Sequence, residues 1–262
     1  MADGMHVHSF SLTVSEGKRL IAKGVAALPC VKRAMGEGIV VVTRSTTSGY
    51  VLEELLGRVV DRASFVTGRT LPSKPPELAG MLSGNLGSAV LRNGELVEGM
   101  EIAEALAEMK AGDVIVKSPN ALDYDRGLVG YLIGAATGGT VGATLGSVHG
   151  RNFHFVAPCG LEKQVAGDLL QASSLVTAAG EMRKGPGIWV TPAEIVTELD
   201  AIEMLTGAEA MQVGAGGILG AEGAAWIAVR GSEQQVQAAT ALVDGVRGEP
   251  SMLEYLQGRS EG

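Results

Sequence analysis

Aromatic residues and cysteines are scarce in this sequence of 262 residues, and acidic residues outnumber basic ones. Phe, Trp and Tyr together make up only 4%, so we do not expect a core built from large rings. The two cysteines, Cys30 and Cys159, exclude a disulfide framework and fit a reducing compartment, so we expect a cytoplasmic protein. A net charge of −8 without any cluster of Lys and Arg argues against a nucleic-acid partner.

Membrane segments are also not expected. Residues 127–148 carry no charged side chain, and glycine recurs at every fourth position from Gly130 to Gly146, a spacing that packed membrane helices use. A single span without basic flanks or an aromatic belt is nevertheless a poor membrane segment. We favour a buried glycine-rich loop that leads into a closely packed helix. The first ten residues have neither a basic region nor a long apolar run, so we expect no signal peptide.

The sequence does contain much glycine, 38 residues, and short apolar runs that alternate with helical patterns. This alternation predicts an α/β fold with a Rossmann-like, mainly parallel sheet in residues 1–184. After Gly185 the pattern changes to strand, helix, strand, strand and helix, which indicates a smaller ferredoxin-like α+β domain in residues 185–248. Residues 249–262 are expected to be a tail.

Several local signals fix the expected elements. Asn93-Gly94 predicts a tight hairpin turn within residues 89–99, because both positions tolerate positive φ angles. Thr191 and Glu194 form a capping-box pattern around Pro192, which predicts a helix that ends at Gly207. Residues 188–190 are then the first strand of the ferredoxin-like unit.

Residues 38–57 are the stretch that points most clearly to a ligand. The apolar run Ile39–Val42 is followed by Thr43-Arg44-Ser45-Thr46-Thr47-Ser48-Gly49 and then by helical spacing. In α/β proteins, ligands bind at the carboxyl ends of strands, and free amides at the start of the next helix favour anions. We therefore predict a phosphate or carboxylate site formed by Arg44, Ser45, Thr46, Thr47 and Ser48. The alternative is that the hydroxyl groups only cap the helix.

The same loop carries a family resemblance. Thr43-Arg44-Ser45-Thr46, running into a helix that closes with Leu56-Gly57, is similar to the phosphate loop of ribose-5-phosphate isomerases. Residues 113–123 resemble that family's strand and acidic loop, and residues 132–139 resemble its Lys-Gly-Gly-Gly-Gly segment. The resemblance implies a fold shared with amino-sugar-phosphate deaminases and coenzyme A transferases. It also implies a binding site that includes Asn120, Gly138, Gly139 and Thr140.

The family's catalytic set is not retained. Its loop acids would align with Lys117, Asn120 and Ala121, and its lysine with Gly134, so ribose-5-phosphate isomerase activity itself is not expected. Asp123 keeps a carboxylate in register. We therefore take Lys117 as a candidate for neutralising an anion and Asp123 as a candidate base, with a surface lysine and a helix-capping aspartate as the alternative.

Residue type indicates two further candidate sites. Cys159 ends an expected strand before a helix start, where a lowered thiol pKa and a pairing with His149 or His154 would make a nucleophile; a small buried residue is the alternative. His6 and His8 share one face of an expected strand but lack a third ligand, so we predict no metal site. We also expect no cofactor.

These observations together predict a protein that binds and transforms a small phosphorylated or carboxylated metabolite, by isomerase or transferase chemistry. Two alternatives stay open: a non-catalytic metabolite sensor, and a thiol-dependent transferase or hydrolase that acts through Cys159. The expected partner is the small anionic metabolite, with no nucleic acid and no membrane. A homo-oligomer is left open.

Overall fold

The computed structural model describes residues 4–66, 70–71, 82, 86–182 and 184–260, and its centre is a six-stranded mixed sheet. The predicted α/β fold with a mainly parallel sheet is confirmed. Strands β10, β8, β5 and β2 run parallel, and β3 and β4 add an antiparallel hairpin at one edge. In spatial order the strands are β10 (Glu194–Val196), β8 (His154–Pro158), β5 (Val114–Val116), β2 (Ile39–Val42), β3 (Ala89–Arg92) and β4 (Glu95–Leu96).

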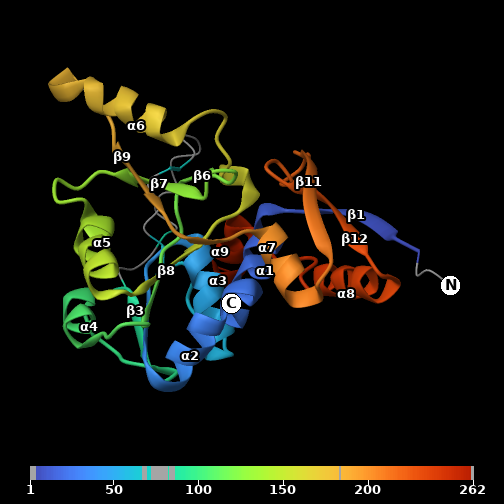
Figure 1. Cartoon of the computed structure of the whole chain (residues 1–262), viewed down its shortest axis with the longest axis horizontal. Helices are drawn as coiled ribbons and strands as arrows, with labels where there is room; N and C mark the ends of the chain where they lie inside the picture. The colour runs from blue at the N-terminus through green and yellow to red at the C-terminus, as the bar shows by residue number, and fades with distance from the viewer. Residues whose placement is uncertain (1–3, 67–69, 72–81, 83–85, 183, 261–262) are drawn as a thin grey trace.

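Helices cover both faces of this sheet, as Figure 1 shows. Alternate side chains of a strand point to opposite faces, so Val40 and Val42 enter one apolar cluster while Val41 enters the other. The first cluster lies under α1 (Val14–Ala27), α2 (Pro29–Glu37) and α3 (Thr46–Leu56). The second lies under α4 (Ile102–Glu108) and α5 (Gly139–Arg151). Burial on both faces explains why these strands read as uninterrupted apolar runs.

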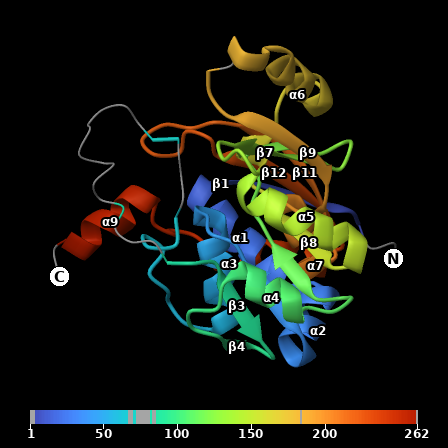
Figure 2. The same cartoon turned by 90° about the vertical axis from the view of Figure 1, so that its left-hand side faces the viewer.

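Two three-stranded antiparallel sheets complete the fold. One joins β6 (Ala121–Asp123), β7 (Leu128–Ile133) and β9 (Gly187–Pro192), and α6 (Leu169–Ala178) packs against β9. The other joins β1 (His6–Leu12), β12 (Ala225–Gly231) and β11 (Glu209–Ala215), with α7 (Glu198–Thr206) and α8 (Glu233–Asp244) packed against it. Figure 2 shows β7, β9 and α6 lying to one side of the central sheet.

The C-terminal α+β unit is assembled differently from the expectation. Residues 188–190 belong to β9, which pairs with β7, and the third strand of the β11–β12 sheet is instead β1 from the start of the chain. The predicted helix start around Thr191 is wrong by nearly two turns, because residues 187–192 form β9 and residues 194–196 form β10. The helix begins after Thr197, whose side chain accepts hydrogen bonds from the amides of Leu199 and Asp200. Pro192 is accommodated because it is the last residue of β9, which lies at the edge of its sheet.

Other local predictions are confirmed. The hairpin of β3 and β4 turns at Asn93 and Gly94, both with positive φ angles of 51° and 84°. In residues 127–148 the predicted helix is present as α5, but the predicted buried glycine-rich loop is wrong: residues 128–133 form β7, and residues 134–137, which link β7 to α5, are exposed. In the described part of the chain, no helix combines the length and apolar character needed to cross a bilayer.

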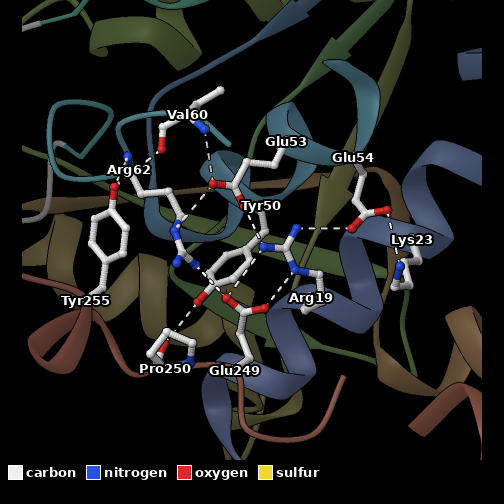
Figure 3. Close-up of polar contacts among 10 residues, drawn as sticks. All are labelled: Arg19, Lys23, Tyr50, Glu53, Glu54, Val60, Arg62, Glu249, Pro250 and Tyr255. Carbon is white, nitrogen blue, oxygen red and sulfur yellow. Dashed lines mark hydrogen bonds and ion pairs between the residues drawn. The ribbon is translucent and has the colours of Figure 1, made fainter. Parts of the chain in front are cut away.

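The segment expected as a tail contains a helix, α9 (Met252–Ser260), and a buried ion network lies where it joins the fold (Figure 3). Glu249 forms ion pairs with Arg19 at 2.9 Å and Arg62 at 3.0 Å, and Glu53 bridges the same two guanidinium groups from α3. Both guanidinium groups lie over the ring of Tyr50, at 4.7 and 4.3 Å from its centroid. Two cations thus face two carboxylates in a largely buried position, so the charges of this central set balance.

Tyr255 of α9 extends the same contact. Its hydroxyl accepts a hydrogen bond from the Arg62 amide and donates one to the Val60 carbonyl. Its ring also lies under the Arg62 guanidinium. The helix is therefore attached through polar contacts that span about 200 positions of the chain, which a sequence pattern does not report.

Candidate functional site

The carboxyl ends of β2 and β5 border the most favourable place for a ligand in this sheet. The helix that follows β2, α3, lies on one face of the sheet, whereas α5, which follows β5 and the β6–β7 hairpin, lies on the other. When the connections of two neighbouring parallel strands leave to opposite faces, they leave a crevice between them at the carboxyl edge.

A cavity of about 400 Å³ lies at this point. It is large enough for a small metabolite, since ligand pockets commonly range from about 300 to 1,000 Å³. Its walls come from the ends of β2 and β5, from the residues before β3, and from the starts of α4 and α5. The lining residues are Arg44, Gly87, Ser88, Glu101, Ile102, Lys117 and Thr140.

The cavity brings together three residues that the sequence pointed to: Arg44, Lys117 and Thr140. Arg44 follows β2, and its Nη1 donates a hydrogen bond to the carbonyl of Leu86 at 2.9 Å, which fixes the guanidinium at the wall. Thr140 lies in the first turn of α5, where the helix dipole is positive. Among the described lining residues Glu101 is the one acidic side chain, so Arg44, Lys117 and Glu101 together carry a formal charge of +1.

Lys117 is the most perturbed group of the wall. Burial lowers its pKa from 10.5 to about 8, because a charged ammonium loses hydration there. Its Nζ lies 5.3 Å from the centroid of the Tyr131 ring, and no ion pair joins it to a carboxylate in the described part of the chain. A desolvated cation of this kind gains from any anion that enters the cavity.

The hydroxyl groups at the start of α3 are arranged otherwise than expected. Ser45 is the N-cap: its Oγ accepts a hydrogen bond from the Ser48 amide at 2.9 Å and donates one to Ser48 Oγ at 2.8 Å. The hydroxyls of Thr43 and Thr47 are buried and have no hydrogen-bond partner among described residues. None of these residues, nor Thr46, is part of the cavity wall. For Ser45 and Ser48 the capping alternative describes the contacts.

The remaining predicted residues lie outside the wall. Asn120 precedes β6, and its Oδ1 accepts a hydrogen bond from the Leu132 amide at 3.0 Å, which fixes the β6–β7 hairpin. Asp123 ends β6 and lies 3.9 Å from Arg126, which itself pairs with Asp168 at the N-cap of α6. No hydrogen bond or ion pair joins Asp123 to Lys117 in the described residues, and Asp123 is not among the lining residues of the cavity.

Gly138 and Gly139 begin α5 with φ angles of 81° and 55°. A Cβ on Gly138 would lie 3.1 Å from Gly142 and 3.2 Å from the Trp189 ring, so close packing as well as φ requires glycine there. Gly138 lines a second, more open hollow of about 520 Å³ between the β7–β9 sheet and α6. Of Gly138, Gly139 and Thr140, only Thr140 lines the cavity of about 400 Å³ above β2 and β5.

A second group of titratable residues lies at the same edge of the sheet, after the carboxyl ends of β8 and β10. Its members are Cys159, Glu162, Lys163 and Glu198. Glu198 follows β10 and is 3% exposed; burial, together with the charge of Glu162, raises its pKa from 4.5 to about 8. Its Oε2 accepts a hydrogen bond from the Leu161 amide at 3.0 Å. Lys163 Nζ donates to Ser118 Oγ at 2.9 Å, which links this group to the residue after Lys117.

Cys159 belongs to this second group, but not as an activated thiol. It is fully buried, and burial raises its pKa from 9.0 to about 12, the opposite of the lowering that a nucleophile needs. His154 begins β8 and Cys159 follows its last residue, so the two lie at opposite ends of one strand. The premise of a Cys159–His154 pair is therefore not met.

Ser88, Glu101 and Glu198 were missed from the sequence. Ser88 and Glu101 lie far along the chain from both strand ends, and no short motif marks them. Glu198 could have been found if β10 had been recognised, because it follows that strand as Lys117 follows β5. The capping-box pattern at Thr191 predicted a helix where β10 lies.

Comparisons of this chain with protein-family models, curated proteins and solved structures give no match.

Proposed function

We propose that the chain binds a small phosphorylated or carboxylated metabolite in the cavity above β2 and β5. The observation that carries this proposal is the convergence of Arg44 and Lys117, from two neighbouring parallel strands, on one cavity of about 400 Å³. Arginine offers a planar pair of donors for carboxylate or phosphate, and lysine a point charge. Thr140, at the positive end of α5, is a third favourable contact for an anion.

Chemistry on that metabolite is the second part of the proposal, and we assign it to the isomerase or transferase type. Lys117 is the candidate proton donor, since a group with a pKa of about 8 exchanges protons readily near neutral pH. Glu101, in the same wall, is the candidate base. An isomerisation through an enediol needs this combination of a base and an electrophilic or acidic group. Asp123 is not part of this assignment, because it lies outside the wall.

A non-catalytic sensor is the second candidate function. Glu101 is more than one-third exposed and no described contact holds it beside Lys117, which favours binding without turnover. Both candidates share the anion site and differ only in whether the bound metabolite changes. Self-association into a homo-oligomer stays a prediction, and mass photometry of the purified chain measures it.

The test is a thermal-shift screen of sugar phosphates, organic acids and acyl-coenzyme A compounds, followed by calorimetric titration of each stabilising compound. Ligands that bind the folded chain raise its apparent stability by mass action. Arg44→Ala and Lys117→Met should each weaken binding by at least about tenfold, since hydrogen bonds to charged groups contribute about 1.5–3 kcal/mol. Product analysis of each bound compound then separates an enzyme from a sensor.

Matched variants control for the loss of a charge. Arg58→Ala removes an exposed guanidinium after α3, and Lys110→Met removes an exposed lysine at the opposite, amino end of β5. Both should leave the affinity unchanged. If the four variants bind equally well, or if no anion stabilises the chain, the proposed site is wrong.

A further inference from the structure

Three metal-ligating side chains meet at the amino edge of the central sheet, the edge opposite the anion cavity. Cys30 lies in the first turn of α2, His154 is the first residue of β8, and Glu194 is the first residue of β10. In the described part of the chain this is the one group of three or more His, Cys, Asp or Glu residues with donor atoms close enough to hold a metal ion.

The alternation of side chains between the two faces of the sheet explains why Cys30, His154 and Glu194 meet. Glu194 lies opposite Val156 in the parallel pairing of β10 and β8, and His154 shares the face of Val156, two positions along β8. Val156 packs in the apolar cluster under α1 and α2, the cluster to which Cys30 also belongs. His154 and Glu194 therefore point to the side of the sheet on which α2 begins.

The distances between the donors fit a tetrahedral ion. Cys30 Sγ lies 3.6 Å from Glu194 Oε2, and His154 Nδ1 lies 3.6 Å from the same oxygen. All three donors lie within 4.8 Å of one another. Zinc bonds of about 2.3 Å to sulfur and about 2.0 Å to nitrogen or oxygen place the donors of a tetrahedral site about 3.3–3.6 Å apart.

The donor types select the class of metal. Thiolate and imidazole suit zinc and its neighbours in the first transition row, whereas magnesium and calcium require oxygen ligands throughout. The side chains of His154 and Glu194 are each 41% exposed, so solvent reaches the group from outside. Three protein ligands with access for water are the pattern of zinc sites that keep an open fourth position.

We propose that Cys30 Sγ, a ring nitrogen of His154 and the Glu194 carboxylate bind a divalent zinc-class cation, with water as the fourth ligand. The thiolate and the carboxylate together neutralise the two positive charges of the ion. This site is independent of the proposed anion cavity, since it lies at the other edge of the sheet and shares no residue with it.

The competing interpretation is a hydrogen-bonded triad without metal. In it the Cys30 thiol donates a hydrogen bond to Glu194, and His154 pairs with the same carboxylate. The two interpretations differ in a spectroscopic signal. Cobalt(II) in place of zinc, bound tetrahedrally by a thiolate, gives intense visible d–d bands and a sulfur-to-cobalt charge-transfer band in the near ultraviolet, neither of which a hydrogen-bonded triad produces.

The experiment titrates the full chain, prepared without a histidine tag and stripped by a chelator, with cobalt(II) and then with zinc. We expect one cobalt per chain, both sets of bands, and their loss as zinc displaces cobalt. Cys30→Ser should remove the charge-transfer band, whereas Cys159→Ser, at the buried cysteine of the opposite edge, should keep it. His154→Gln and Glu194→Gln should each weaken binding by more than about tenfold, because even supporting residues around a metal contribute that much.

Controls separate this group from other donors. His149→Gln and Glu37→Gln change exposed residues of the same types and should leave the titration unchanged. Circular dichroism checks that each variant folds; if Cys30→Ser does not, the Glu194 and His154 variants decide. The proposal is overturned if a large excess of cobalt gives no tetrahedral bands. It is also overturned if the charge-transfer band survives in folded Cys30→Ser, or if cobalt binding depends on His6 and His8.

Discussion

Replacing Lys117 by methionine should stabilise the ligand-free chain. Burial lowers the pKa of this lysine from 10.5 to about 8, and a pKa difference of one corresponds to about 1.4 kcal/mol, so holding the charge in the folded state costs up to about 3 kcal/mol at neutral pH. Methionine has a similar length and no charge to desolvate. We therefore expect Lys117→Met to raise the free energy of unfolding at pH 7 by about 2–3 kcal/mol while weakening anion binding.

The stability advantage of Lys117→Met should depend on pH. Because the folded pKa lies below the unfolded one, the unfolded chain binds more protons between pH 8 and 10.5, and the contribution of Lys117 to stability rises across that window. The advantage of the variant should thus be constant below pH 8 and shrink toward pH 10. Urea unfolding of wild type, Lys117→Met and Lys110→Met at pH 7, 8.5 and 9.5 measures it. A variant less stable than wild type at pH 7, or an advantage that does not change with pH, refutes the assignment of a desolvated lysine.

The remaining predictions concern other sites. Glu198→Gln should flatten the fall in stability between pH 4.5 and 8, because a carboxyl with a pKa raised to about 8 costs the folded chain progressively more as pH rises; urea unfolding at pH 5 and 7.5 checks it. Glu249→Gln, which leaves buried guanidiniums with one carboxylate fewer, should lower the free energy of unfolding by about 3 kcal/mol, whereas exposed Glu98→Gln should not. Gly138→Ala should destabilise by more than about 1 kcal/mol, and Gly146→Ala, in the open interior of α5, should stabilise slightly; thermal melts compare them.

Elements with local causes could be predicted from the sequence. Ile39–Val42 is a short apolar run of the kind that a strand buried on both faces carries, and Ser45 in the hydroxyl-rich segment after it supplies the N-cap of α3. Asn93-Gly94 specifies its turn because both residues accept positive φ. Arg44 and Lys117 could be assigned to one edge from the sequence, since both follow predicted strands and parallel strands end on the same side.

Features that depend on which strands become neighbours could not be predicted from the sequence, because long-range pairing sets them. The local signal at Thr191 predicts a helix start, but residues 187–192 pair with β7 and the helix is capped by Thr197 instead. Hydroxyl groups can hydrogen-bond to each other, as Ser45 and Ser48 do. The number of hydroxyl residues in this segment therefore predicted more ligand-facing groups than the structure has. Cys30, His154 and Glu194 lie in separate segments and no spacing relates them. They meet only because β8 and β10 run in parallel register and α2 begins above their amino ends.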